Sequence, residues 1–212
     1  MSFRWKIAQK AELKWWENYL SSKSVPEYQA WKRDYWEKFL NFLPFPIKAG
    51  ATVLDAGCGP AGIFTVLNKQ EVTACDPLLD QYSKKLEHFS PEAFPWTQFE
   101  NVAIEKMDFE EKFDYVFCIN AINHVDSLEL SCRKLVKALK PNGWLVVSTD
   151  AHNMGLLKKL FQAVPGDILH PHQYNRSEYR NFLEKEGVNL GSGKLIKKEL
   201  IFSYWLEWGQ KK

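Results

Sequence analysis

One ten-residue stretch constrains the fold of this chain more than any other. It reads Val53-Leu54-Asp55-Ala56-Gly57-Cys58-Gly59-Pro60-Ala61-Gly62. An apolar run, then glycines, then an apolar-periodic segment predict a buried strand, a tight loop and the N-terminus of a helix. Gly57 can adopt the positive φ that this turn needs, and Gly59 lets a ligand approach the backbone closely. Pro60 fits the first turn of a helix, where its missing N–H has no partner to lose.

The acidic residue ahead of the glycines indicates the charge of the ligand. A loop that binds pyrophosphate gathers N–H dipoles and lacks fixed negative charge. Asp55 stands two residues before the first glycine, and we expect its carboxylate to face the same crevice. It would repel a phosphate but suit S-adenosylmethionine (SAM), which carries an ammonium and a sulfonium. The glycine spacing alone is a weak signal, because many nucleotide-binding α/β proteins share it. A glycine turn that binds no ligand is the alternative.

Two motifs resemble those of the class I SAM-dependent methyltransferases. An acidic residue, any residue and then Gly-x-Gly is similar to the first motif of that family. The fourth motif is matched by Phe113, Asp114, Val116, His124 and Asp126. The resemblance covers about residues 50–187. It implies an α/β fold of the Rossmann-like methyltransferase type, with a doubly wound, mostly parallel seven-stranded sheet and SAM as the cofactor.

Further residues predicted to hold the cofactor follow along the chain. Asp76 ends a predicted strand about twenty residues after the glycine turn, where an acid can accept both ribose hydroxyls. Nicotinamide enzymes also use an acid there, and a strand-end carboxylate in solvent is another reading. The resemblance implies an adenine-contacting loop at Ile104 and Glu105, with an ordinary surface acid as the alternative for Glu105. The predicted cofactor set is Asp55, Gly57, Cys58, Gly59, Pro60, Asp76, Pro77, Ile104, Glu105, Asn120 and Ala121.

The start of the chain is rich in aromatic side chains at helical spacing, such as Tyr28, Trp31 and Tyr35. We expect two amphipathic helices that form an N-terminal cap, residues 1–46, before a SAM-binding methyltransferase domain, residues 47–212. In the family that the chain resembles, such segments often form a lid, which makes Tyr28 and Trp31 candidates for substrate contact. The alternative is that both helices only pack on the domain.

Three histidines are candidates for catalysis, because a neutral imidazole can take a proton near pH 7. His124 lies in the fourth motif, where a structural role at a helix start is the alternative. His170 and His172 belong to residues 151–173, which we predict to be a substrate-facing insertion. Their spacing matches no recognisable ligand pattern, so we expect no metal.

Periodicity and turn residues predict the remaining elements. A short helix should follow the glycine loop. The others are a strand from Glu71 to Cys75, a helix from Leu78 to Phe89, a strand near Thr97 to Ala103, a strand from Phe113 to Asn120, a helix capped by Asp126, a strand from Trp144 to Thr149, a helix capped by Asn175 with Glu178, and an antiparallel pair that includes Leu200 to Trp208.

Composition bears on compartment and partners. The net charge is +2, both signs are interspersed and no basic block occurs, so we expect no nucleic-acid partner. The four cysteines form no C-x-x-C pair, and we expect free thiols in a reducing compartment. We find no signal peptide and no apolar run of membrane-spanning length, and therefore expect a cytoplasmic protein without a membrane partner. We expect a monomer or a homodimer.

Together these features predict an enzyme that transfers a methyl group from SAM to a small-molecule acceptor by in-line displacement. The chain has no Asn-Pro-Pro-Tyr or Asp-Pro-Pro-Tyr sequence at Asn120, which argues against DNA adenine and glutamine as acceptors. Two alternatives stay open. One is a Rossmann-type NAD(P)-dependent oxidoreductase, against which Asp55 weighs, and the other is a non-catalytic SAM-binding module.

Overall fold

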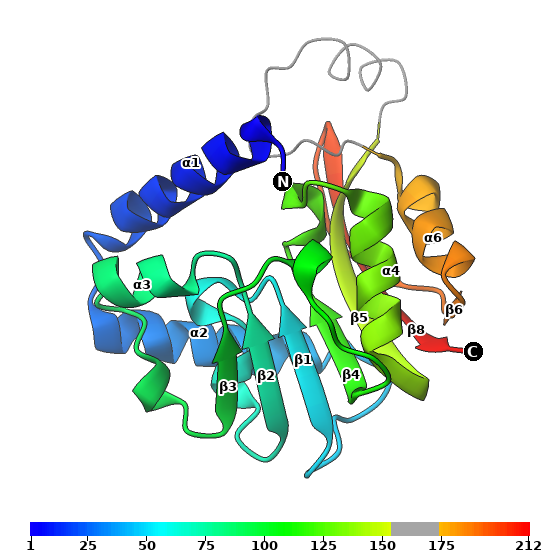
Figure 1. Ribbon diagram of the computed structural model, residues 1–212, viewed down its shortest axis with the longest axis horizontal. Helices are drawn as coiled ribbons and strands as arrows, with labels where there is room; N and C mark the ends of the chain where they lie inside the picture. Colours follow the sequence, from blue (N-terminus) through cyan, green and yellow to red (C-terminus); the bar gives the residue numbers. More distant parts are fainter. Residues whose placement is uncertain (154–173) are drawn as a thin grey trace.

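A mostly parallel sheet forms the centre of the computed structural model, which describes residues 1–153 and 174–212 (Figure 1). Within these residues the sheet has eight strands in the order β3-β2-β1-β4-β5-β8-β6, and β7 also pairs with β8. The strands β1 to β5 run parallel and bring their carboxyl ends to one edge. The bounds are β1 (Thr52–Ala56), β2 (Glu71–Cys75), β3 (Thr97–Glu100), β4 (Phe113–Cys118), β5 (Leu139–His152), β6 (Val188–Leu190), β7 (Lys194–Lys198) and β8 (Phe202–Lys211).

The described part of the sheet has one strand more than the seven predicted, and the extra strand arises at its antiparallel end. Strand β8 runs antiparallel to β5, and both β6 and β7 pair with the opposite edge of β8. Between them the chain breaks at Gly191-Ser192-Gly193, where Gly193 has a φ of +67°. This break divides one edge into two short strands. The mostly parallel α/β sheet with a closing antiparallel pair is otherwise confirmed.

Helices cover both faces of the sheet (Figure 1). Trp36 and Phe39 of α2 share one apolar core with Val53 of β1, whereas Leu135 of α4 shares a second core with Leu54. Successive strand side chains point to opposite faces, so neighbouring residues of β1 belong to different cores. The doubly wound arrangement is thereby confirmed. The helices are α1 (Phe3–Leu20), α2 (Val25–Leu40), α3 (Leu79–Lys85), α4 (Leu128–Ala138) and α6 (Arg176–Lys185), and the 3-10 turns are η1 (Gly59–Ala61), η2 (Ile63–Val66), η3 (Pro91–Ala93), η4 (Ile104–Lys106) and η5 (Ile122–His124).

The helix predicted after the glycine loop is replaced by the two short turns η1 and η2. Side chains bind backbone groups that an α-helix would pair internally. The Trp36 Nε1–H donates to the Ala61 carbonyl at 2.9 Å, and Asp55 Oδ2 accepts from the Phe64 N–H at 3.1 Å. These tertiary bonds outweigh the local helical pattern.

Several other elements also differ from their predicted limits. Strand β5 runs from Leu139 to His152 and so extends beyond the predicted Trp144 to Thr149 at both ends, whereas β4 ends at Cys118, before the predicted Asn120. Strand β3 and helix α3 are both shorter than predicted, and α3 ends where Leu86 becomes extended, with φ −116° and ψ 112°. Helix α4 is capped by Ser127, whose Oγ accepts from the Leu130 N–H, rather than by Asp126. The carboxylate of Asp126 is instead engaged by Ser2 at the start of α1.

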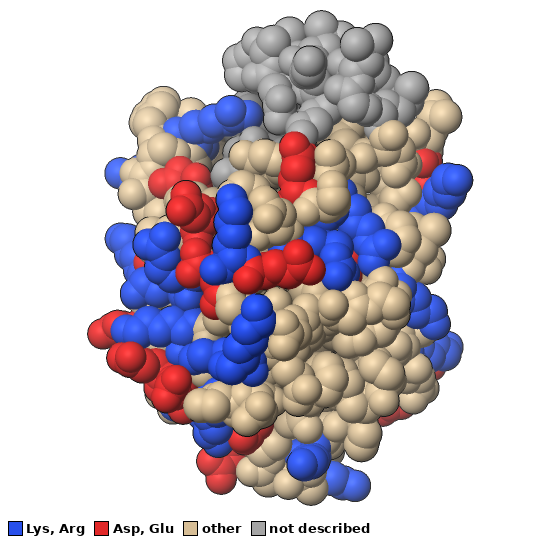
Figure 2. Space-filling view, turned by 90° about the vertical axis from the view of Figure 1, so that its right-hand side faces the viewer, with Lys and Arg blue, Asp and Glu red and all other residues tan. Residues whose placement is uncertain are grey.

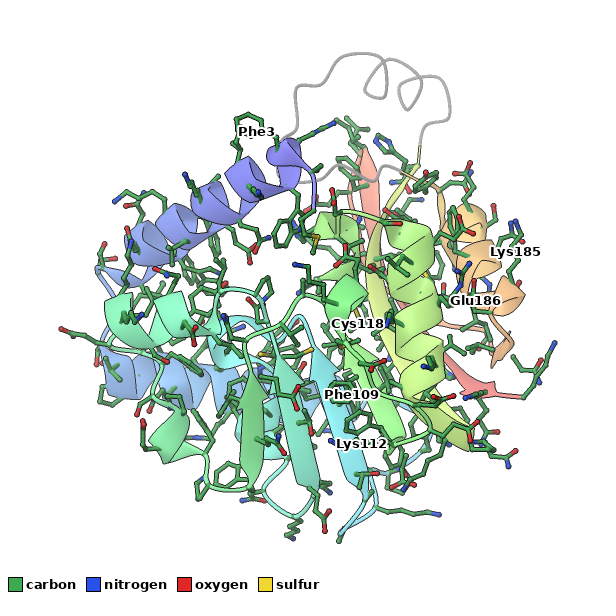
Figure 3. All side chains as sticks on the ribbon, viewed as in Figure 1. Phe3, Phe109, Lys112, Cys118, Lys185 and Glu186 are labelled. Atoms are coloured by element: carbon green, nitrogen blue, oxygen red, sulfur yellow. The ribbon has the colours of Figure 1, made fainter. Side chains whose placement is uncertain are left out.

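Helix α1 lies across the carboxyl ends of the parallel strands (Figure 1). The N–H of its capping residue Ser2 donates to Asp126 at 2.7 Å, and the Ser2 hydroxyl donates to the same carboxylate. Leu13 and Leu20 are buried in the core that α2 shares with the sheet, whereas Phe3, 79% exposed, points away from it (Figure 3). The helix therefore forms a roof over the edge at which the strands end.

Charged side chains of both signs are interspersed over the face shown in Figure 2. This face fits the near-neutral net charge of +2. Among the described residues, no helix combines the length and the apolar character that crossing a membrane requires.

The indole bond of Trp36 yields a prediction on stability. Trp36→Phe removes the donor to the buried Ala61 carbonyl, so the free energy of unfolding should fall by about 1–3 kcal/mol. Urea denaturation followed by circular dichroism measures the change. Trp31→Phe on the same helix, where the side chain is 50% exposed, is the matched control and should change stability by less than about 0.5 kcal/mol. Equal losses in both variants would show that this bond does not support the loop.

Candidate active site

Two adjoining cavity lobes lie beneath α1 at the carboxyl ends of the parallel strands. Figure 3 marks the end of β4 by Cys118, just below this region. The narrow lobe has a volume of about 60 Å³ and the aromatic lobe a volume of about 460 Å³. The residues that line both lobes are Glu12, Gly57, Asn120 and His124.

Most of the predicted cofactor residues meet in these lobes, although they come from separate loops. Because the carboxyl ends of parallel strands share an edge, the loops that follow β1, β2 and β4 converge there. The narrow lobe brings together Gly57, Asp76, Pro77, Ile104, Glu105, Asn120 and Ala121, and the aromatic lobe adds Cys58 and Gly59.

Gly57 makes the turn that opens the site. Its φ is +70°, and a Cβ at this position would overlap the Cβ of Ala121. The N–H groups of Gly57 and Cys58 both donate to the Cys75 carbonyl, at 2.8 and 3.1 Å. The loops after β1, β2 and β4 are thereby held in contact, and a larger residue than glycine would separate them.

Two predicted cofactor residues lie outside both lobes. Asp55 is 2% exposed beneath the loop, where its Oδ2 accepts from the Phe64 N–H. Pro60 is buried on the far side and borders a separate small cavity with His88. The expectation that the Asp55 carboxylate faces the crevice therefore needs correction, because backbone N–H groups draw it under the loop. Direct contact of Asp55 or Pro60 with a cofactor stays a prediction.

Asp76 lines the narrow lobe, and its carboxylate can accept more hydrogen bonds than it receives from the protein. Its Oδ2 accepts from the Gly59 N–H at 3.0 Å and its Oδ1 from the Leu78 N–H at 2.9 Å. Each carboxylate oxygen has a further acceptor site, which a hydroxyl group can use. Burial raises the pKa of Asp76 to about 6, although the two backbone bonds act in the opposite direction.

Glu12 adds a carboxylate that sequence reasoning missed. It is half-buried on α1, and burial first and the charge of Asp76 second raise the pKa of Glu12 to about 7. Burial also raises the pKa of Asp55 to about 7. A signal was present, because Glu12 lies four residues after Ala8 and three before Trp15, two of the apolar residues that recur at helical spacing in the first predicted helix. Three carboxyl groups near one loop favour a ligand that carries positive charge or donates hydrogen bonds.

The far end of the narrow lobe is apolar. Ile104 and Val125 are 4% and 5% exposed and form part of its wall. The Oε1 of Glu105 accepts from the N–H groups of Asp126 and Ser127 at 2.6 and 3.1 Å, so this side chain holds the turn before α4. A contact between Glu105 and a cofactor stays a prediction.

The aromatic lobe contains both residues predicted to contact the substrate. Tyr28 is 4% exposed and its hydroxyl has no hydrogen-bond partner among the described residues, while Trp31 is half-exposed. Lys32 places its ammonium 5.5 Å from the ring centroid of Trp31, and burial lowers the pKa of Lys32 to about 8. Sequence reasoning did not single out Lys32 or the further lining residues Trp15, Trp16, Tyr19, Trp36 and Ile119.

Of the three candidate histidines, only His124 lies within the residues that the structure describes. His124 ends η5 and lines both lobes next to Asn120, whose φ is +55° and whose N–H donates to Ser148 Oγ at 2.8 Å. His170 and His172 lie outside the described residues, as does most of the predicted insertion. Only His124 can therefore be related to the cavity.

Comparisons with known proteins agree with this geometry. A family model described as a methyltransferase domain matches residues 28–192. The ubiquinone biosynthesis O-methyltransferase of Chromobacterium violaceum is 30% identical over 178 residues, which cover 81% of this chain and 72% of that protein. The enzyme of the same name from Rickettsia conorii is 32% identical over 99 residues, which cover 46% of this chain. The chain spans about a third of that relative, 34% of its length.

Solved structures resemble the fold at low sequence identity. The YcgJ protein of Bacillus subtilis superposes with a TM-score of 0.65 at 12% identity, covering 84% of this chain and 97% of that one. The 1,6-didemethyltoxoflavin-N1-methyltransferase of Burkholderia thailandensis, solved with S-adenosylhomocysteine, gives a TM-score of 0.57 at 14% identity, covering 91% of this chain and 80% of that one. These likenesses confirm the predicted fold class.

The raised carboxyl pKa values yield a prediction on pH. The pKa values of Glu12, Asp55 and Asp76 are about 7, 7 and 6 in the folded chain, against ordinary values of 4.5, 3.8 and 3.8. Between these limits the folded state binds more protons than the unfolded chain, so stability falls as pH rises. The thermal midpoint of the ligand-free protein should therefore drop between about pH 5 and pH 8, and Glu12→Gln should reduce the drop.

Glu17→Gln on the same helix is the control for this measurement. Hydrogen bonds from Lys85 and Lys14 lower the pKa of Glu17, so this group acts in the opposite direction. The control variant should keep the full drop. A midpoint that is constant or rises over this range would contradict the assignment.

Proposed function

Because this chain belongs to the methyltransferase domain family, we propose that it transfers the methyl group of SAM to a small, flat acceptor bound in the aromatic lobe. The observation that carries the proposal is that a narrow acidic lobe and a wide aromatic lobe meet at Glu12, Gly57, Asn120 and His124. A nicotinamide-dependent oxidoreductase, the alternative that the glycine spacing allowed, is not the family found.

The residues of the narrow lobe suit the nucleoside of SAM. Ile104 and Val125 offer apolar surface to the adenine, and Asp76 offers two oxygens with free acceptor sites to the ribose hydroxyls. The amino-acid end of SAM carries one positive and one negative charge. Lys32 lines the aromatic lobe and offers its ammonium to the carboxylate of SAM, whereas Asp55 lies buried beneath the loop and would act on the ammonium of SAM through its charge. SAM, when bound, supplies a methyl group already activated by the sulfonium.

The aromatic lobe suits the acceptor. Its wall includes the rings of Trp15 and Tyr19, which stack with centroids 4.8 Å apart and planes 7° from parallel. Aromatic faces bind flat apolar groups through burial and ring stacking. The volume of about 460 Å³ lies within the range of small-molecule pockets. We infer an acceptor of one or two rings rather than a macromolecule.

The contribution of the protein to methyl transfer is mainly alignment and exclusion of water. The roof formed by α1 covers the junction of the lobes and keeps bulk water from the reacting atoms. An acceptor whose attacking atom carries a proton needs a base. His124 lies at that junction, so we assign it the role of accepting the proton.

Ligand binding tests the cofactor assignment. In titration calorimetry, SAM and S-adenosylhomocysteine should bind and NAD should not. Asp76→Ala should weaken SAM binding by about 1–3 kcal/mol, the scale of hydrogen bonds to a charged group. Asp80→Ala is the matched control. It removes an exposed carboxylate from α3, which follows Asp76 in the chain, and should leave the affinity for SAM unchanged. Binding of NAD without SAM would refute the proposal.

Turnover tests the role of His124. Release of S-adenosylhomocysteine should be screened over phenols, aromatic amines and nitrogen heterocycles, and His124→Asn should then slow the best acceptor by about 10²–10⁴-fold. Affinity for S-adenosylhomocysteine should change far less. Full turnover in His124→Asn would remove His124 from catalysis. Tight SAM binding with no acceptor in the screen would instead favour a non-catalytic SAM-binding module.

A further inference from the structure

Helix α1 presents acceptor groups to the narrow lobe as well as apolar groups to the core. Ala8 and Leu13 are buried, whereas their neighbours Gln9 and Glu12, which lie one turn apart, line the lobe. Gln9 is 9% exposed, and its Oε1 has no hydrogen-bond partner among the described residues. A buried acceptor without a partner is costly unless a ligand donates to it.

Glu12 is weakly satisfied in the same lobe. The Tyr82 hydroxyl and the Gln9 Nε2–H donate to its two oxygens, both at 3.4 Å, near the long limit for a hydrogen bond. The Trp16 indole also hydrogen-bonds to this carboxylate. Within residues 1–153 and 174–212, no lysine or arginine forms an ion pair with Glu12 or Asp76. Two carboxylates thus approach one space, and no cation from the described part of the chain pairs with either of them.

The ligand that fits this pair must donate hydrogen bonds to two carboxylates from one small group. The vicinal hydroxyls of a ribose do so, because each can donate to a different carboxylate. Asp76 comes from the end of β2 and Glu12 from the roof, so the two would hold the ribose from opposite sides. The two carboxylates also repel one another: burial first and the charge of Asp76 second raise the pKa of Glu12.

We propose that Glu12 is a cofactor-binding residue that accepts a hydrogen bond from a ribose hydroxyl of SAM, opposite Asp76. Helix α1 then completes the nucleoside site, and its Glu12 carboxylate contacts the cofactor rather than the acceptor. This inference rests on the proposed function only in taking SAM as the cofactor. It does not depend on the identity of the acceptor or on turnover.

Affinity for nucleosides that differ by one hydroxyl tests the proposal. Calorimetry should compare S-adenosylhomocysteine with its 2′-deoxy and 3′-deoxy analogues on the wild type, Glu12→Ala and the isosteric Glu12→Gln. Glu12→Ala should bind S-adenosylhomocysteine about 10- to 150-fold more weakly. For one of the two deoxy analogues the wild type and Glu12→Ala should bind equally, because the hydroxyl and its partner act as one unit. Glu12→Gln keeps an acceptor oxygen and should lose less.

Glu17→Ala, on the same helix with its charge paired to Lys14 and Lys85, is the matched control and should bind all three ligands as the wild type does. Thermal unfolding of each variant confirms the fold. Unchanged penalties for both missing hydroxyls in Glu12→Ala would overturn the proposal. So would a loss for SAM without a loss for S-adenosylhomocysteine, which would place Glu12 at the sulfonium. If S-adenosylhomocysteine fails to bind the wild type, the cofactor assignment itself is wrong.

Discussion

The buried carboxylate of Asp55 is the constraint on which the rest of the site depends. Its Oδ2 accepts from the Phe64 N–H and occupies the space that a Cβ on Gly62 would need. The chain after the loop is therefore held in 3-10 turns close to β1. That position lets the indole of Trp36 bind the Ala61 carbonyl, which brings the aromatic side of α2 to the loop. One buried acid thus positions both the glycine turn and part of the cavity wall.

Charge in the site is distributed over three elements rather than concentrated at one strand end. Burial opposes ionisation of Asp55, Asp76 and Glu12, and each raised pKa reflects how incompletely the surrounding protein groups compensate the charge. Hydrogen bonds from backbone N–H groups offset part of this cost for Asp55 and Asp76. For Glu12 the bonds come from the side chains of Trp16, Tyr82 and Gln9, and the last two are long, at 3.4 Å.

The sequence was sufficient for the features that depend on local pattern. Buried runs and the glycine turn located β1, β2 and β4, and strand-end spacing placed Asp76 in the site. It was insufficient where tertiary contacts decide. Periodicity identified the apolar stripe of α1 but not the surface that it covers, so it did not single out Glu12. The 3-10 turns depend on Trp36, which lies far along the chain, and no local rule anticipates such a bond.

Helix α1 links the two lobes mechanically. Glu12 and Trp16 lie one turn apart, and Trp16 belongs to the wall of the aromatic lobe. The same helix is fixed at its start by Ser2, which donates to Asp126, two residues beyond His124. A displacement of the roof would therefore alter the nucleoside side, the acceptor side and the loop of the proposed base together. On the proposed assignment, one rigid element would therefore border the cofactor, the acceptor and the loop of the base.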